Sequence, residues 1–276
     1  MTILTQAENQ TVNQTVQAFD SLAARYDCLF TRSMIGRAQR SAVWKVLKET
    51  FKAGDHILEI NCGTGEDALF LARNGLSVVA CDASEQMVQT ARQRMGCEDP
   101  DAPIHFEVLP TEQLWRLRPD DLFDGALSNF SGLNCVANLQ QTARDLAALV
   151  TPGAPVLLCF STRFCLAETI WFVFQGRFGK AFRRTSGTAT VKVDGFSVKV
   201  RYPTLRSIMR MFAPCFLLRS CTGIGIAVPP SYLEPWARKY PRVLRLLRRI
   251  DKRVSRLPWL RTMGDHMLLH FERVEG

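Results

Sequence analysis

The stretch Ile57-Leu58-Glu59-Ile60-Asn61-Cys62-Gly63-Thr64-Gly65-Glu66-Asp67-Ala68 decides the fold. The apolar residues around Glu59 predict a buried strand, and residues 62–65 predict a tight turn. Residues 67–73 then have helical periodicity, which Asn74-Gly75 ends. A strand, a glycine turn and a helix N-terminus together form a cradle whose backbone N–H groups can meet a nucleotide-like ligand.

A second acidic residue follows at the spacing that a nucleotide-binding unit requires. Asp82 ends the next apolar run and lies about 20 residues after the glycine turn, where a carboxylate binds ribose hydroxyls. The pattern Gly63-x-Gly65-x-x-Ala68 also satisfies the dinucleotide fingerprint. However, Glu59 lies inside the strand, where its charge favours a cationic ligand over a pyrophosphate.

These residues resemble the first motif of the class I S-adenosylmethionine-dependent methyltransferases, which reads hydrophobic-x-Glu-x-x-Cys-Gly-Thr-Gly. The resemblance is close over residues 57–67 and extends with falling strength over residues 19–160. It implies that S-adenosyl-L-methionine is the cofactor and S-adenosyl-L-homocysteine the product. It also implies that Glu59 holds the methionine amino group, that the backbone of Gly63 and Gly65 passes under the ligand, and that Asp82 binds the ribose. An ordinary turn of an unrelated α/β protein is the alternative.

The resemblance assigns further cofactor contacts. A helix predicted over residues 16–30 is similar to the helix that covers the cofactor in many of these enzymes, which places Tyr26 at the methionine end. Arg37 is chosen over Arg32 and Arg40 for the ligand's carboxylate. Met87 is expected to pack on the adenine, although core packing would explain Met87 and Tyr26 equally well. The other expected cofactor contacts are Asn61, Ala83, Thr111, Glu112, Ser128 and Asn129.

A fourth strand, predicted over residues 121–129, should end beside the cofactor, because open α/β sheets bind ligands outside their carboxyl ends. Phe130 and Asn134 are therefore expected to contact the acceptor. Family members that methylate amino groups of nucleic acids and proteins usually carry Asn-Pro-Pro-Tyr here. Residues 128–131 read Ser-Asn-Phe-Ser, which argues against that branch.

The predicted fold is α/β, a Rossmann-like, seven-stranded, mostly parallel sheet with an antiparallel last strand and an inserted cap. Residues 1–160 should form the cofactor-binding core with an N-terminal helical cover, and residues 204–276 should complete the sheet and add a basic helical segment. Residues 161–203 should form the cap, an aromatic helix followed by a β-hairpin around Asp194-Gly195. Phe164 and Trp171 are expected to line the substrate site, unless the helix only packs on the sheet. Residues 1–15 are polar and expected to be frayed.

The net charge of +9 is unevenly distributed along the 276 residues. Residues 1–138 hold 12 basic and 18 acidic residues, whereas residues 139–276 hold 23 basic and 8 acidic ones. Residues 238–261 alone hold ten basic residues and one acid, with apolar residues along one helical face. This segment fits an ordinary surface helix, a helix on anionic lipid, or a phosphate contact.

No apolar run reaches about 18 residues, and the N-terminus lacks a secretory signal, so we expect a cytoplasmic protein, with membrane association left open. The nine cysteines have no Cys-x-x-Cys spacing, so reduced thiols and no metal are expected.

The sequence therefore predicts methyl transfer to oxygen or carbon of a small, largely apolar or lipid-like acceptor. His266 is the one candidate general base, although a structural histidine would account for it too, and the catalytic residues are otherwise unknown. Methylation of RNA by the basic half is the alternative enzyme, disfavoured by the missing prolines. A non-catalytic, membrane-docking ligand-binding protein is the third hypothesis. The sequence does not indicate an oligomeric state.

Overall fold

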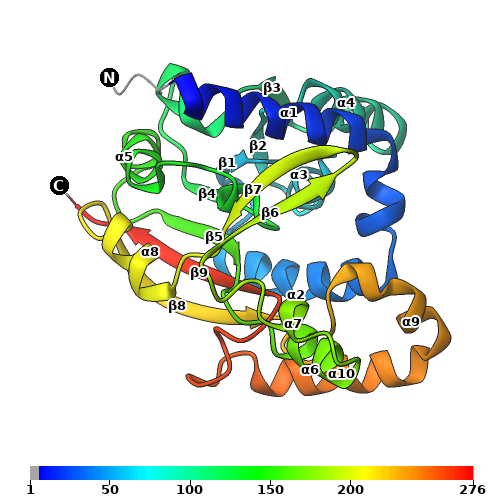
Figure 1. Ribbon diagram of the computed structural model, residues 1–276. Coiled ribbons are helices and arrows are strands. Elements are labelled where there is room, and N and C mark those ends of the chain that lie inside the picture. Colours follow the sequence, from blue (N-terminus) through cyan, green and yellow to red (C-terminus); the bar gives the residue numbers. More distant parts are fainter. Residues whose placement is uncertain (1–5, 276) are drawn as a thin grey trace.

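The computed structural model describes the backbone of residues 6–275 and the side chains of residues 12–275 (Figure 1). One sheet forms its centre, built from β1 (His56–Ile60), β2 (Ser77–Asp82), β3 (Ile104–Val108), β4 (Gly125–Ser128), β5 (Pro155–Ser161), β8 (Phe216–Ile224) and β9 (His266–Arg273). The strand order is β3-β2-β1-β4-β5-β9-β8, and β9 is antiparallel to both of its neighbours. The Rossmann-like sheet with an antiparallel last strand is thereby confirmed.

Helices cover both faces of this sheet (Figure 1). They are α1 (Gln6–Tyr26), α2 (Met34–Thr50), α3 (Glu66–Ala72), α4 (Glu85–Glu98), α5 (Leu139–Leu149), α6 (Leu166–Phe174), α7 (Phe178–Ala181), α8 (Leu205–Phe212), α9 (Glu234–Lys239) and α10 (Pro241–Val254).

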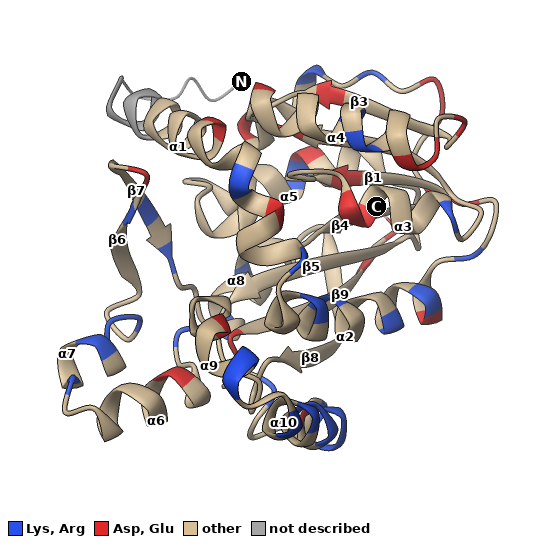
Figure 2. Ribbon diagram, turned by 90° about the vertical axis from the view of Figure 1, so that its right-hand side faces the viewer, with Lys and Arg blue, Asp and Glu red and all other residues tan. Residues whose placement is uncertain are grey.

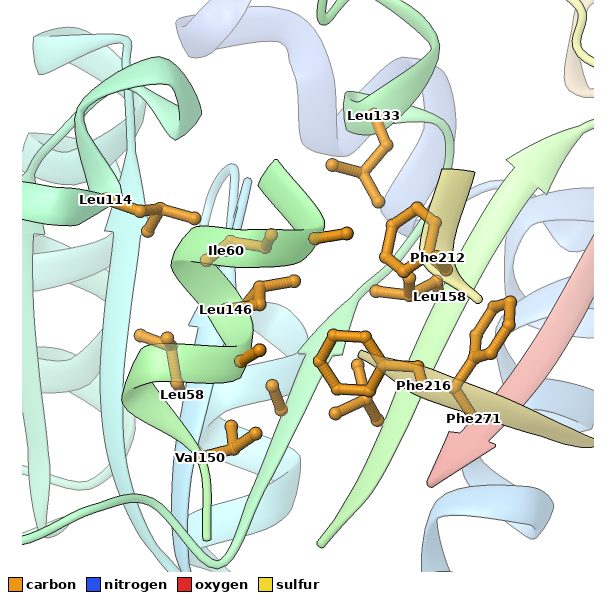
Figure 3. Close-up of a cluster of buried hydrophobic side chains, with 14 of the residues drawn as sticks. Leu58, Ile60, Leu114, Leu133, Leu146, Val150, Leu158, Phe212, Phe216 and Phe271 are labelled. Carbon is orange, nitrogen blue, oxygen red and sulfur yellow. The ribbon is translucent and has the colours of Figure 1, made fainter. Parts of the chain in front are cut away.

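Alternation along the strands divides the core into two layers, because successive strand side chains point to opposite faces. Leu58 and Leu158 face α5 and α8, in the layer that also holds Phe212 and Phe271 (Figure 3). Ile57 and Leu157, one residue earlier in each strand, face the opposite layer with α2, α3 and α4. The sheet is therefore buried on both faces, and only its edges and strand ends remain for a ligand.

The N-terminal cover differs from its prediction. Residues 6–15 are helical rather than frayed, because α1 is one long helix that packs against α4 and against a β-hairpin. A π-helical turn, Asp27–Thr31, then leads to α2, which begins at Met34 because the Ser33 side chain accepts a hydrogen bond from the Gly36 backbone N–H. The prediction for residues 1–5 lies outside the described residues.

The hairpin forms where the sequence predicts it, from β6 (Thr188–Val193) and β7 (Phe196–Arg201), outside the main sheet. It lies along α1 (Figure 1), and the Arg25 guanidinium forms an exposed ion pair of 2.5 Å with Asp194 at its turn. The helix α6 lies elsewhere, with the Trp171 ring 6.2 Å from the Trp236 ring of α9. The two parts of the predicted cap therefore have different neighbours.

Candidate active site

A cavity of about 490 Å³ lies at the carboxyl ends of the parallel strands. Its floor is formed by the residues that follow β1, β2 and β4 and by the start of β9, while α1 and the hairpin contribute its cover. Its volume falls within the range of about 300–1,000 Å³ that is usual for small-molecule sites. Among the side chains that the structure describes, residues 12–275, no group of three or more His, Cys, Asp or Glu is arranged to hold a metal ion.

The glycine turn after β1 forms one wall of this cavity. Asn61, Gly63 and Gly65 all have positive φ angles, of 58°, 55° and 73°. The Asn61 side chain stabilises the turn, since its Nδ2 donates to Thr111 Oγ1 (2.9 Å) and its Oδ1 accepts from Ser128 Oγ (3.1 Å). Asn61 and Gly63 line the cavity, whereas Gly65 and Ser128 lie outside the lining.

The two glycines of the turn should respond differently to substitution. A Cβ at Gly65 would lie 2.8 Å from the Ala91 Cβ and 3.0 Å from the Phe106 ring, whereas a Cβ at Gly63 meets nothing within 4 Å. We expect Gly65→Ala to lower the free energy of unfolding by about 2–4 kcal/mol, from strain and overpacking together. Gly63→Ala, the matched control, should cost only the backbone strain of about 1–2 kcal/mol. Urea unfolding measures both, and equal losses would contradict the proposed packing.

The Asp82 carboxylate is held at the cavity by the backbone. Its Oδ2 accepts from Gly63 N (2.8 Å) and its Oδ1 from Ser84 N (2.9 Å). Burial raises the pKa of Asp82, and the backbone N–H groups oppose that shift. Ala83 and Met87 continue the same wall, since Ser84 caps α4 and its hydroxyl donates to Asp20 of α1 (2.6 Å).

Glu59 lies behind the lining residues and is only 1% exposed. Burial, reinforced by the charge of Asp67, raises the pKa of Glu59 well above its usual range, while Arg40 opposes the shift. Its Oε2 atom has no hydrogen-bond partner among the described residues. A buried carboxyl oxygen without a partner is costly, so this end of the cavity favours a cationic group.

An arginine does reach the cavity, but it is Arg40. The Arg37 side chain, predicted for the ligand's carboxylate, is exposed and lies outside the lining, so the geometry favours Arg40 for this role. Because α2 begins at Met34, its buried stripe includes Arg40 and leaves Arg37 toward solvent. Arg40 is ion-paired with Asp67, and its guanidinium carbon lies 4.8 Å from the centre of the Phe130 ring.

Asp67 gathers three donors at this point and so fixes the wall. Besides Arg40, it accepts from Trp44 Nε1 (2.6 Å) and Asn129 Nδ2 (2.9 Å). The predicted cofactor residues that line the cavity are Tyr26, Asn61, Gly63, Asp82, Ala83, Met87, Thr111, Glu112 and Asn129.

The acceptor residues are placed differently from their prediction. Phe130 lines the cavity, but Asn134 is fully buried and bonds the backbone of Ser161 and Arg201 instead. Phe164 and Trp171 do not line the cavity, because the chain after β5 carries α6 toward α9. These three residues therefore lie outside the cavity where the acceptor was expected.

Four hairpin valines take the place of the expected aromatic lining. Val191 and Val193 of β6 and Val198 and Val200 of β7 all line the cavity. Within each strand they are two residues apart, so strand alternation brings their side chains to one face. The sequence predicts this alternation, but it does not predict that the valine face of the hairpin turns toward the cavity.

Polar side chains lie at the other end of the cavity, around His266 at the start of β9. Burial lowers the pKa of His266 and Arg184 lowers it further, although Asp265 opposes both, so the imidazole is neutral near pH 7. Its Nδ1 lies 3.5 Å from Asp265 Oδ2 and has no hydrogen-bond partner among the described residues. Asp265 itself is held by Arg184 Nη2 (2.9 Å) and Gln39 Nε2 (3.1 Å). The cavity lining at this end also includes Tyr202, Tyr232 and Arg183.

Comparisons with known proteins agree with this geometry. A family described as a methyltransferase domain matches residues 57–153. The demethylmenaquinone methyltransferase of Clavibacter sepedonicus is 31% identical over 147 residues, which are 52% of this chain and 57% of that protein. The ubiquinone/menaquinone biosynthesis C-methyltransferase UbiE of Geotalea uraniireducens (strain Rf4) is 30% identical over 162 residues, 57% of this chain and 68% of that protein. The chain belongs to the class I S-adenosylmethionine-dependent methyltransferases.

Two further comparisons describe how far the similarity to known proteins extends. The chain spans little more than half the length of the Clavibacter relative. The crystal structure of the [4+2]-cyclase SpnF superposes with a TM-score of 0.64 over 96% of this chain and 98% of that one. At 14% identity that similarity shows the fold alone.

The residues present fit the family's cofactor. Asp82 presents a carboxylate to the cavity at the place of a ribose-binding acid, and Gly63 offers a backbone without a side chain beside it. The unpartnered Oε2 atom of Glu59 is a buried acceptor that the methionine ammonium group would satisfy, and this cation would also favour the ionised carboxylate. S-adenosyl-L-methionine is therefore the cofactor of this family member.

Proposed function

We propose that this family member transfers the sulfonium methyl group of S-adenosyl-L-methionine to oxygen or carbon of a small, largely apolar or lipid-like acceptor. The observation that carries the proposal is that one cavity is lined both by Asp82 with the glycine turn and by the four hairpin valines. The names of the relatives from Clavibacter and Geotalea favour carbon and a quinone-type acceptor.

Bound S-adenosyl-L-methionine supplies a methyl group that is already activated. Asp82 would accept from the ribose hydroxyls, and Met87 with the backbone near Thr111 and Glu112 would hold the adenine. Tyr26 of α1 and the hairpin valines keep water from the reacting atoms, which favours an in-line displacement between aligned partners.

His266 is proposed to accept the acceptor's proton. A phenolic or enolic acceptor becomes a better oxygen or carbon nucleophile once it loses a proton, and a neutral imidazole can take that proton. His266 lines the cavity and packs edge-on against Phe130, with ring centres 5.4 Å apart. The proton then resides on an imidazolium that Asp265, directly before it in the chain, can stabilise.

RNA methylation remains the second candidate because of the basic residues in 238–261. The valine-lined cavity does not favour a nucleotide base, so we place this candidate behind the apolar acceptor.

The proposal is tested in two steps. Calorimetric titration with S-adenosyl-L-methionine and S-adenosyl-L-homocysteine should give micromolar affinities. Transfer of a labelled methyl group should then be measured with quinols, phenols and RNA as acceptors. Cofactor binding followed by labelling of RNA alone would replace the apolar acceptor, and a folded protein that binds neither cofactor would overturn the proposed activity.

A further inference from the structure

Three large aromatic side chains are exposed at one end of the molecule. Phe174 at the end of α6 is 88% exposed, Phe178 at the start of α7 is 60% exposed, and Trp259 after α10 is 86% exposed. Ile170 and Val173 of α6 are also exposed, at 48% and 38%. Large exposed apolar side chains that gather on one part of a protein surface favour an interaction site.

The helix α10 adds a strongly basic face beside an apolar stripe. Arg242, Arg245, Arg249 and Arg253 are exposed on it, and Val243, Leu246 and Ile250 form an exposed stripe at helical spacing next to them. Its one acid, Asp251, is turned inward, where it accepts from the backbone N–H groups of Ala227 (2.6 Å) and Val228 (3.3 Å). The outward charge of α10 is therefore entirely positive.

These elements share one end of the molecule. In Figures 1 and 2, α6, α7 and α10 all lie at the lower end, and Figure 2 shows the basic residues of α10 there. A buried cluster that includes Leu244 links α6 and α10 from beneath, because Trp171 of α6 and Leu247 of α10 both pack against it. We call the exposed residues of α6, α7, α10 and segment 255–261 the docking face.

The docking face adjoins the cavity. The Phe172 ring of α6 stacks on Tyr232, with ring centres 6.2 Å apart, and Tyr232 lines the cavity. Arg183, two residues after α7, lines the cavity as well. An acceptor that leaves a bilayer at the docking face would therefore reach the cavity past these side chains.

We propose that the docking face binds the surface of an anionic lipid bilayer, with Phe174, Phe178 and Trp259 inserted among the headgroups and the arginines of α10 on the lipid phosphates. This proposal rests on the proposed function only for the delivery of a lipid-like acceptor. Basic residues beside an apolar stripe are the composition of interfacial helices, and aromatic rings favour the headgroup region. A second copy of this chain fits poorly, because a symmetric contact would oppose two rows of arginines.

Sedimentation of the full chain with vesicles tests the proposal. Binding is expected to vesicles of equal parts phosphatidylcholine and phosphatidylglycerol, to weaken with salt, and to be absent with phosphatidylcholine alone. The variant Arg245→Gln/Arg249→Gln/Arg253→Gln should lose about a hundredfold in affinity. The variant Phe174→Ser/Phe178→Ser should lose at least about tenfold, because it removes two inserted rings. Arg206→Gln/Arg210→Gln on α8 and Trp115→Ser are matched exposed controls and should bind like the natural chain.

Several outcomes would overturn the docking face. The first is no binding to anionic vesicles, and the second is an equal loss of vesicle affinity in the control variants. The third is a contact with polyanions, in which the chain binds RNA but not vesicles and Phe174→Ser/Phe178→Ser leaves the RNA affinity unchanged. Calorimetry with S-adenosyl-L-methionine on the same variants separates this result from the proposed function. A chain that binds vesicles but no cofactor would overturn the function alone, and a chain that methylates soluble acceptors but ignores vesicles would overturn the docking face alone.

Discussion

Replacement of Asp82 by alanine is expected to weaken S-adenosyl-L-methionine binding by about 100- to 1,000-fold. The Asp82 carboxylate positions the backbone N–H groups of Gly63 and Ser84 and would accept from the ribose hydroxyls. Its loss therefore removes direct contacts and also loosens the glycine turn. Titration calorimetry measures the change.

Two further variants make the Asp82 result interpretable. Asp82→Asn keeps the shape of the side chain and one acceptor oxygen. It should therefore lose less affinity for S-adenosyl-L-methionine than Asp82→Ala and keep the melting temperature of the natural chain. Asp121→Ala removes an exposed carboxylate before β4, toward the amino ends of the parallel strands and so opposite the cavity, and should bind cofactor normally. Natural affinity in Asp82→Ala would show that the ribose is held elsewhere.

Replacement of His266 by glutamine is expected to lower kcat for methyl transfer by about 10²- to 10⁴-fold, the usual contribution of a general base, with cofactor affinity unchanged. The pH profile of the natural chain provides the second readout. Burial lowers the pKa of His266 below its ordinary value of 6.5, so the neutral base is fully present above pH 7. The rate should therefore be flat there and fall only as pH drops through that lowered pKa.

His270→Gln is the matched control for His266, since His270 lies on the same strand, is partly buried and does not line the cavity. Its kcat should stay within about twofold of the natural chain, because it holds no reacting group. A rate that rises as pH falls, or an unchanged kcat in His266→Gln, would exclude His266 as the base. A lowered kcat in a protein whose natural pH profile is flat throughout would assign it a positioning role instead.

The strand-turn-helix of residues 57–73 and the hairpin of residues 188–201 could be predicted because their signals are local. Apolar runs, glycines and the Asp194-Gly195 turn determine these elements within a few residues, without distant contacts. Asp82 could be placed for the same reason, since one short crossover fixes its distance from the glycine turn.

The structure differs from the sequence-based expectation where tertiary contacts decide which side chains face the cavity. Whether Arg37 or Arg40 faces the cavity depends on where α2 begins, which the Ser33 cap sets. Trp171 looked like cavity lining because it is aromatic, but packing against Trp236 of α9 directs α6 elsewhere. The polar residues 6–15 are helical because α1 packs on α4 and the hairpin, contacts that no pattern within that segment reveals.

Two of the contacts that hold the cover of the cavity in place differ in their exposure to solvent. The hairpin is tied to α1 by the exposed Arg25–Asp194 ion pair, which solvent screens. Beside the glycine turn, Asp27 accepts from Thr64 (2.7 Å) and pairs with Arg94, in a mostly buried network that solvent screens less. We therefore expect acceptor and methylated product to exchange quickly beneath the hairpin, while the departure of spent S-adenosyl-L-homocysteine sets the pace of repeated turnover.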